Sequence, residues 1–195
     1  HYFTSYYNTY PNGTYTELAR FHSGKALFLD TPEPRLDQSS TFSAISELQM
    51  FMEYFPASKR KTEAQQMIFE LQDKLVMKDY LTAKLYYDLG TYTGNASYTA
   101  DMRINGNNFL ACITTAQNAL KDYPYTSMRE EISILLLRAK HKLGSESVLE
   151  KKEERMRETI DEYYAFKNEF PESKYMKEVE SIYKDASKYV KELNE

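Results

Sequence analysis

The chain contains no tryptophan, one cysteine, and only six glycines and six prolines among its 195 residues. A single cysteine excludes an internal disulfide, and Cys112 falls on an apolar helical face, which favours a buried structural thiol over a catalytic one. No apolar run reaches the roughly 18 residues that a membrane-spanning helix needs. Few helix breakers, with abundant Glu, Lys, Leu and Ala, are typical of an all-helical protein.

Patterns that carry chemistry are also missing. His1, His22 and His141 are far apart and have no partners at ligand spacing. No glycine-rich phosphate loop follows a predicted strand, and no strand is predicted. A net charge of −4 provides no basic signature for nucleic acid. We therefore expect a non-enzymatic protein with no cofactor, no metal site and no nucleic-acid partner.

What the chain does have is one short pattern four times. An aromatic residue precedes proline at Tyr10-Pro11, Phe55-Pro56, Tyr123-Pro124 and Phe170-Pro171, with intervals of 45, 68 and 47 residues. Two residues beyond the prolines lie residues of helix N-cap type: Gly13, Ser58, Thr126 and Ser173. Because proline cannot continue a helix, each copy predicts the end of one helix and the start of the next.

Apolar and small residues keep a fixed register around these prolines. They lie at Ala44, Cys112 and Thr159 (twelve before), Phe3, Leu48, Ala116 and Tyr163 (eight before), Tyr6, Phe51, Ala119 and Phe166 (five before), Ala19, Ala64, Ile132 and Val179 (eight after), and Ala26, Leu71, Ala139 and Ala186 (fifteen after). A period of about 45 residues with this stripe predicts a tetratricopeptide-type solenoid of helical hairpins, coiled as a right-handed superhelix. Such solenoids usually bind proteins.

The pattern predicts about nine helices in a single domain over 1–195. They are the tail of a repeat over 1–10 and helices near 14–29, 39–54, 58–76, 78–90, 108–122, 127–143, 147–169 and 173–193. N-terminal repeats cover about 1–76 and C-terminal repeats about 77–195, with a polar insertion at about 91–107. Because the chain opens at His1 and not at a methionine, we expect any signal peptide or lipid anchor to precede it.

Two features are candidates for binding. The first is the two-proline loop of Asp30, Pro32, Glu33, Pro34, Arg35, Asp37 and Gln38, in which Glu33 and Asp37 could orient the Arg35 guanidinium. Two prolines reduce the entropy lost when the loop is ordered, which suits a pocket, although a rigid connector fits equally well. The second is the set of tyrosines, of which the chain has 18.

Most aromatic residues fit the repeat core, but adjacent pairs do not. In Tyr86-Tyr87 and Tyr163-Tyr164 one ring of each pair must point away from its hairpin. Tyr163 and Tyr164 are therefore candidates for contact with an extended peptide. They lie in helix 147–169, whose mixed charges indicate a solvated face or, alternatively, a docking surface for a charged partner.

Several stretches are similar to one known family. The run 44–58, the bridge 71–80 followed by Ala83-Lys84-Leu85-Tyr86-Tyr87, and Ala119–Pro124 resemble the BamD (YfiO) family of outer-membrane assembly lipoproteins. The resemblance implies a five-repeat solenoid on the periplasmic face of the outer membrane, held by a lipid on an N-terminal cysteine. It also implies partners, namely a BamA-type barrel subunit contacted through the C-terminal repeats, other assembly lipoproteins and unfolded outer-membrane proteins.

Two functions therefore remain open. The leading hypothesis is a scaffold for the BamA periplasmic domains that also holds unfolded outer-membrane protein segments. The alternative is a periplasmic repeat adaptor for another cell-envelope or division complex. A lipid-bearing cysteine ahead of this sequence would favour the first hypothesis, and a coiled-coil extension would favour the second.

Overall fold

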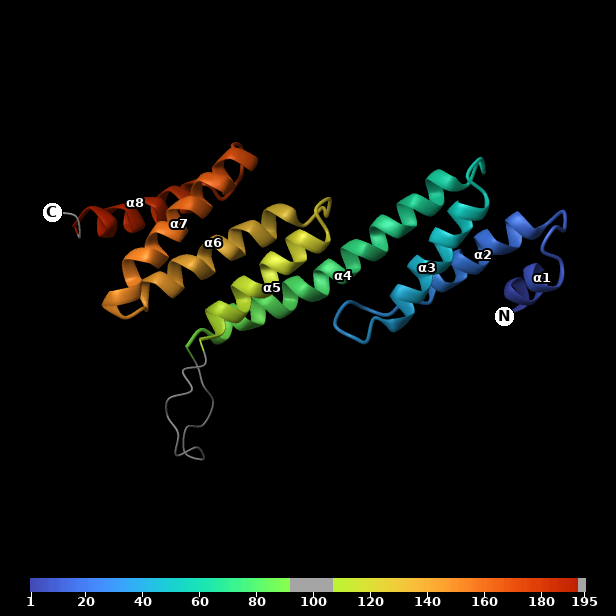
Figure 1. Ribbon diagram of the computed structural model, residues 1–195, viewed down its shortest axis with the longest axis horizontal. Coiled ribbons are helices and arrows are strands. Elements are labelled where there is room, and N and C mark those ends of the chain that lie inside the picture. Colours follow the sequence, from blue (N-terminus) through green and yellow to red (C-terminus); the bar gives the residue numbers. More distant parts are fainter. Residues whose placement is uncertain (92–106, 193–195) are drawn as a thin grey trace, which may run out of the picture. The chain divides into compact units, whose positions relative to one another are not determined.

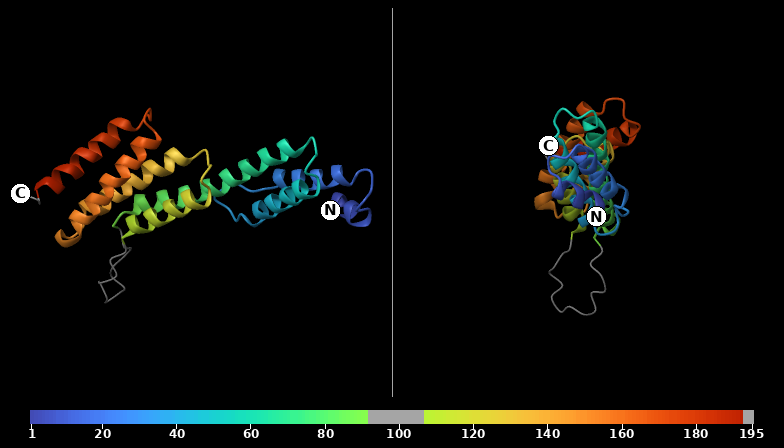
Figure 2. Two further views of the ribbon diagram at one scale, coloured as in Figure 1. Left: turned by 45° about the horizontal axis from the view of Figure 1, so that its top comes forward. Right: turned by 90° about the vertical axis from the view of Figure 1, so that its right-hand side faces the viewer.

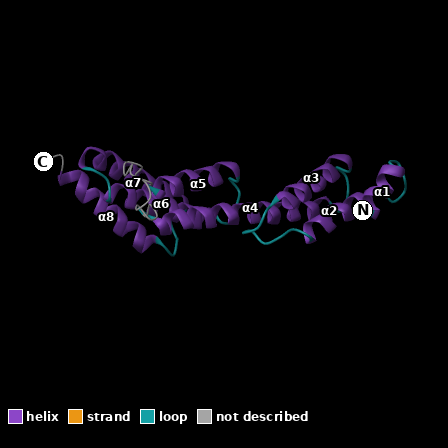
Figure 3. Ribbon diagram, turned by 90° about the horizontal axis from the view of Figure 1, so that it is seen from below, coloured by secondary structure: helices purple, strands orange, loops and turns teal. Residues whose placement is uncertain are grey.

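The computed structural model describes residues 1–91 and 107–192, which form eight helices and no strand (Figures 1 and 3). The helices are α1 (Tyr2–Thr9), α2 (Thr16–Leu29), α3 (Ser39–Tyr54), α4 (Lys61–Leu89), α5 (Asn108–Asp122), α6 (Arg129–Ser145), α7 (Leu149–Glu169) and α8 (Met176–Glu192). The chain divides into unit 1, residues 1–78, and unit 2, residues 79–195. The all-helical prediction is confirmed, and the described count is close to the nine expected.

One predicted boundary is wrong. Separate helices were expected over 58–76 and 78–90, but α4 is continuous for 29 residues. No proline or glycine interrupts it, and Leu75, Val76 and Ala83 are buried along its length. The helix ends as predicted at Gly90, whose φ of +54° is the left-handed conformation of a glycine cap.

The length of α4 explains part of the 68-residue interval between prolines. The corresponding first helices of the other hairpins, α2 and α6, have 14 and 17 residues, so α4 is longer by three to four turns. The predicted insertion at 91–107 falls on residues 92–106, which lie outside the described part of the chain.

The four aromatic-proline junctions share one backbone geometry. At the second junction the Phe55 N–H donates to the Phe51 carbonyl over 3.0 Å, and the Ser58 N–H donates to the Phe55 carbonyl over 3.0 Å. The Ser58 hydroxyl accepts from the Arg60 N–H, which caps a turn ahead of α4. Because of this turn, the helices begin at 16, 61, 129 and 176, up to three residues later than predicted.

The core of unit 1 lies where α2, α3 and the first half of α4 run side by side (Figure 2). It consists of Phe21, Ala44, Leu48, Phe51, Ala64, Met67, Ile68 and Leu71. Phe21 and Phe51 meet edge to face with ring centroids 5.4 Å apart. Their contact joins α2 to α3, and fully buried Ala44 is the small residue that the register predicted at a close approach of two helices.

The core of unit 2 lies between α6, α7 and α8. It consists of Ile134, Leu137, Tyr163, Phe166, Val179 and Ile182. The remaining register positions of this unit, including Cys112, Thr159 and Ala186, are also buried. The register is thus confirmed through both units, with three exceptions at the edge of unit 1.

Those exceptions are Phe3, Tyr6 and Ala26. Phe3 and Ala26 are exposed and Tyr6 is half-buried, because α1 has only eight residues and packs mainly on α2. Phe3 keeps one aromatic contact, a stack on His22 with ring centroids 5.4 Å apart.

Candidate binding surfaces

Within the described residues, no three His, Cys, Asp or Glu side chains form a group that could hold a metal ion. Burial raises the pKa of the Cys112 thiol to about 12, so the thiol stays protonated and is a poor nucleophile at neutral pH. No described helix combines the length and apolar character needed to cross a membrane. The candidate binding surfaces are the loop between α2 and α3 and the tyrosines of α7.

The loop between α2 and α3 is built around one buried side chain. The Gln38 amide donates to the carbonyls of Glu33 over 2.8 Å and Leu36 over 3.2 Å. Its oxygen accepts from the Thr41 hydroxyl over 2.7 Å. Gln38 is almost fully buried, so these bonds fix the path of the loop from inside.

Two lysines of α4 tie the same loop to the unit 1 core. The Lys74 ammonium donates to the hydroxyl of Thr31, and the Lys78 ammonium donates to the carbonyl of Leu36 over 3.0 Å. The loop is therefore held at both ends and at its middle, which gives it the order expected of either a rigid connector or a preformed binding surface.

The charged side chains of the loop face solvent. Asp30, Glu33, Arg35 and Asp37 are exposed, and the two prolines are half-buried. Within the described residues, Arg35 forms no ion pair with Glu33 or Asp37, so the expected orientation of its guanidinium is not seen. Instead, hydrogen bonds from Ser39 hold the pKa of the Asp37 carboxyl below its usual value. Six of the seven loop candidates are thus exposed or half-buried, and the seventh, Gln38, is buried.

The two tyrosine candidates have different environments. Tyr163 is 4% exposed and stacks on Tyr183 of α8 with ring centroids 4.2 Å apart. Tyr164 is 48% exposed, and its hydroxyl lies 3.2 Å from that of Tyr183. The hydrogen bond with Tyr183 raises the pKa of Tyr164. Tyr163 is therefore a core residue, and Tyr164 is the member of the pair that a partner could touch.

The other tyrosine pair is less clearly divided. Tyr86 and Tyr87 are both half-buried, and the Tyr87 ring meets Phe109 of α5 edge-on at 5.7 Å. Burial raises the pKa of Tyr87, as expected for a hydroxyl held against apolar surface. The Tyr87 ring thus helps to pack α5 on α4.

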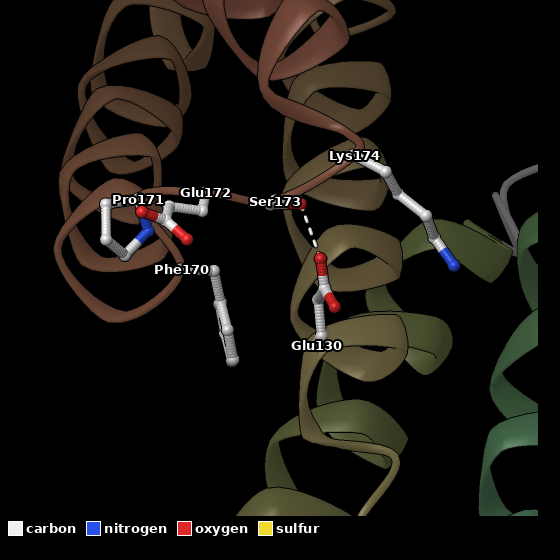
Figure 4. Close-up of a pocket in the computed structure, with 6 residues that line it drawn as sticks. All are labelled: Glu130, Phe170, Pro171, Glu172, Ser173 and Lys174. Carbon is white, nitrogen blue, oxygen red and sulfur yellow. Dashed lines mark hydrogen bonds between the residues drawn. The ribbon is translucent and has the colours of Figure 1, made fainter.

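Unit 2 has a shallow pocket that the sequence did not indicate (Figure 4). It lies at the turn between α7 and α8 and is lined by Glu130, Phe170, Pro171, Glu172, Ser173 and Lys174. The Ser173 hydroxyl donates to Glu130 over 2.5 Å. In unit 1 the Ser58 hydroxyl donates to Glu17 over 2.6 Å at the same register positions. The recurrence of a capping serine and a glutamate six residues after the preceding proline was the signal available in the sequence.

Taken together, the described residues form helical hairpins joined by short turns, with ordered loops and exposed aromatic side chains as their candidate contact surfaces. The chain belongs to the YfiO outer membrane lipoprotein family, which is the BamD family, because the family model matches residues 1–105. This family is a non-catalytic accessory family of the outer membrane. No curated protein matches the chain.

The matched residues include unit 1 and all of α4. The sequence resemblance was extended further, through Ala119–Pro124 and the C-terminal repeats, and residues 106–195 lie outside the matched range. For these residues the resemblance stays a prediction that rests on the run Ala119–Pro124 and on the repeat register.

Proposed function

We propose that this protein is a non-enzymatic subunit of the outer-membrane β-barrel assembly machine. In this role it scaffolds the periplasmic domains of a BamA-type barrel subunit, contacts other assembly lipoproteins and binds segments of unfolded outer-membrane proteins. The observation that supports the proposal most strongly is the family match over residues 1–105. The proposed location is the periplasmic face of the outer membrane, through an N-terminal lipid anchor.

The repeats are proposed to be of tetratricopeptide type and to form a single right-handed solenoid. Support comes from the shared geometry of the four proline junctions and from core residues at equal distances from Pro56 and Pro171. Each hairpin of such an array is stabilised by its neighbours, which leaves long faces free for partners.

Unfolded segments are proposed to bind at the loop between α2 and α3. The loop is already ordered by Gln38, Lys74 and Lys78, so little entropy remains to be lost when a ligand binds. Exposed Leu36 follows Arg35 directly in the chain, and exposed Leu29 ends the helix ahead of the loop, so the loop offers apolar surface as well as a positive charge. Replacing Arg35 with Ala should weaken the binding of such segments, whereas Arg157→Ala in unit 2 is the matched control.

The BamA-type subunit is proposed to bind the C-terminal repeats of unit 2, over about 108–193. On α7, exposed Tyr164 offers an aromatic contact, and the neighbouring face carries charges of both signs. Complementary charge sets the orientation and the rate of encounter, while aromatic residues supply most of the affinity. Tyr164→Ala should reduce binding, and Tyr125→Ala, which replaces another exposed tyrosine of the same unit, is the control.

The proposal is tested by purifying the full-length protein from detergent-solubilised outer membrane. We expect a BamA-type barrel subunit to co-purify in stoichiometric amount. Recovery of division or other envelope proteins without any barrel subunit would overturn the assembly role and favour the periplasmic adaptor.

A further inference from the structure

An arginine of α2 is held between aromatic side chains from the two neighbouring helices. The guanidinium carbon of Arg20 lies 4.2 Å from the ring centroid of Tyr7 in α1 and 4.2 Å from that of Tyr54 in α3. Tyr7 is fixed in turn, because it is buried and its hydroxyl donates to Glu47 of α3 over 2.8 Å. Tyr54 is 62% exposed, so the group opens to solvent on its side.

Within the described part of the chain, no oxygen atom accepts a hydrogen bond from the Arg20 guanidinium, and no carboxylate pairs with it. Most other described arginines of the chain do have an oxygen partner. Oxygen acceptors are found for Arg60, Arg129, Arg138, Arg155 and Arg157. Arg35 also lacks one, but it is exposed and no ring contacts it.

Unit 2 fills the corresponding register positions differently. Nine residues after Pro124, where unit 1 has Arg20, lies buried Ser133. Two residues before Pro171, where unit 1 has Tyr54, lies Glu169, and Arg129 pairs with it. At the position of Tyr54, unit 2 therefore has a carboxylate, which pairs with Arg129 five residues after Pro124, whereas unit 1 has an aromatic ring.

We infer that Arg20 is a binding site for a carboxylate group from another molecule, with Tyr7 and Tyr54 as its supports. A guanidinium presents its N–H donors in a planar fork that matches a carboxylate in two parallel hydrogen bonds. Stacking on the rings leaves the edge of this fork available and limits its rotation. The carboxylate belongs either to an Asp or Glu side chain or to the C-terminus of a peptide.

The site differs in place from the loop between α2 and α3, and it does not depend on the identity of the assembly partner. A peptide carboxylate that binds here would anchor one point of a chain lying along unit 1. Aromatic Tyr54, exposed beside the guanidinium, would contact an apolar residue next to that carboxylate.

The test uses the whole protein and three rhodamine-labelled peptides of one apolar sequence, followed by fluorescence anisotropy. The first peptide has one internal Glu and an amidated end, the second has Gln and a free C-terminal carboxylate, and the third has Gln and an amidated end. We expect at least one carboxylate peptide to bind about tenfold more tightly than the neutral one, as charge-assisted bidentate bonds allow. The preferred peptide identifies the source of the carboxylate.

Variants separate this site from general charge attraction. Arg20→Gln should remove the preference, and Arg20→Lys should recover only a small part of it, because an ammonium lacks the planar fork. Arg35→Gln removes the same charge from unit 1 and should leave the preference intact. Tyr54→Leu should weaken the preference about threefold, whereas Tyr54→Phe, which keeps the ring, should not.

Circular dichroism melting checks that each variant is folded. Because Tyr54 is exposed, its substitution should leave the fold intact. Equal affinity of the wild-type protein for all three peptides would overturn the inference. An equal loss of preference in Arg20→Gln and Arg35→Gln would also overturn it, because it would show that only net charge matters.

Discussion

The two units have the same register and fill it with different chemistry. Five residues before the proline, both bury phenylalanine, Phe51 in unit 1 and Phe166 in unit 2. Eight residues before it, unit 1 buries Leu48 and unit 2 buries Tyr163. At these two positions the same distance from the proline gives a buried residue in both units, although the residue type differs at the second position.

The edge of each core makes the contrast clear. Twelve residues after the proline, unit 1 buries Ile68, while unit 2 has Tyr183 stacked on Tyr163. Lys167 donates to the Tyr163 hydroxyl over 3.0 Å. At this edge, therefore, unit 1 has a buried aliphatic side chain, whereas unit 2 has stacked tyrosine rings and a hydrogen bond to a tyrosine hydroxyl.

Ion pairs between the first helices of successive hairpins, α2 with α4 and α6 with α8, occur at the same register positions in the two units but differ in geometry. Lys25 pairs with Glu63 over 2.7 Å in unit 1. At the same register positions, Arg138 donates two hydrogen bonds of 2.6 Å to Glu178 in unit 2. The unit 2 link is bidentate, which is the stronger arrangement.

The largest expected effect comes from the shared phenylalanine. Phe51→Ala and Phe166→Ala should each cost about 3–5 kcal/mol of unfolding free energy, because a large cavity forms in a closed core. Since hairpins are stabilised by their neighbours, hydrogen exchange should accelerate mainly in the unit that carries the change. Equal acceleration in both units after either substitution would refute their independence.

Ala44→Phe should have a somewhat smaller effect. Ala44 is fully buried between helices of unit 1, and overpacking such a position costs roughly 1–3 kcal/mol. Exposed Ala165 in α7 provides the control, since Ala165→Phe adds the same ring outside the core. If thermal denaturation gave the same Tm for Ala44→Phe and the wild-type protein, the register of unit 1 would be wrong.

Removing one ion-pair partner should change stability by less than about 1 kcal/mol, as for other exposed pairs. Arg138→Met should cost more than Lys25→Met, because only Arg138 forms two hydrogen bonds with its partner. Urea denaturation of both variants measures the difference. If Lys25→Met lowered the unfolding free energy as much as Arg138→Met or more, the bidentate pair would not be the stronger one.

The Arg138 link also predicts a pH dependence. The hydrogen bonds from Arg138 hold the pKa of Glu178 below its usual value of 4.5. The stability that the link contributes is therefore present above pH 4.5 and is lost as the pH falls through the lowered pKa of the folded state. The cost of Arg138→Met, measured by urea denaturation, should shrink in that acidic range and stay constant between pH 6 and pH 8.

Tyr164→Phe should have the smallest effect on stability, with no measurable change in Tm, because Tyr164 is exposed.

A second variant tests the hydrogen bond between the two tyrosine hydroxyls. The hydrogen bond with Tyr183 raises the pKa of Tyr164, so Tyr183→Phe should return the pKa of Tyr164 toward the usual tyrosine value. Absorbance titration of tyrosinate follows the shift. An unchanged titration curve would show that the two hydroxyls do not interact in solution.

Much of this architecture follows from the sequence, because proline, aromatic and cap residues act locally. Four junctions and nearly all register positions were predicted, including small Ala44 and Thr159. The predicted break at 76–78 within α4 was wrong. No proline or glycine between 61 and 89 interrupts the helix, so the sequence contains no local cause for a break there.

The candidate sites were less accessible from the sequence. Register placed Tyr163 in the core, as observed, but the sequence also named Tyr163 beside Tyr164 as a candidate for partner contact, and a side chain that is so deeply buried does not support that role. In contrast, the hydrogen bonds from Lys74 and Lys78 to the loop join residues 43 and 42 positions apart, which no local pattern encodes. The Arg20 group depends on three helices at once and could not be predicted for the same reason.

The central claim, that the two units bind different partners, is tested most directly by one crossed binding measurement. Full-length wild-type protein, Arg35→Ala and Tyr164→Ala are each assayed for binding of the BamA periplasmic domains and of an unfolded outer-membrane protein segment. The account predicts that Arg35→Ala weakens only segment binding and Tyr164→Ala weakens only BamA binding. Loss of both activities in either variant, or full retention of BamA by Tyr164→Ala, would contradict it.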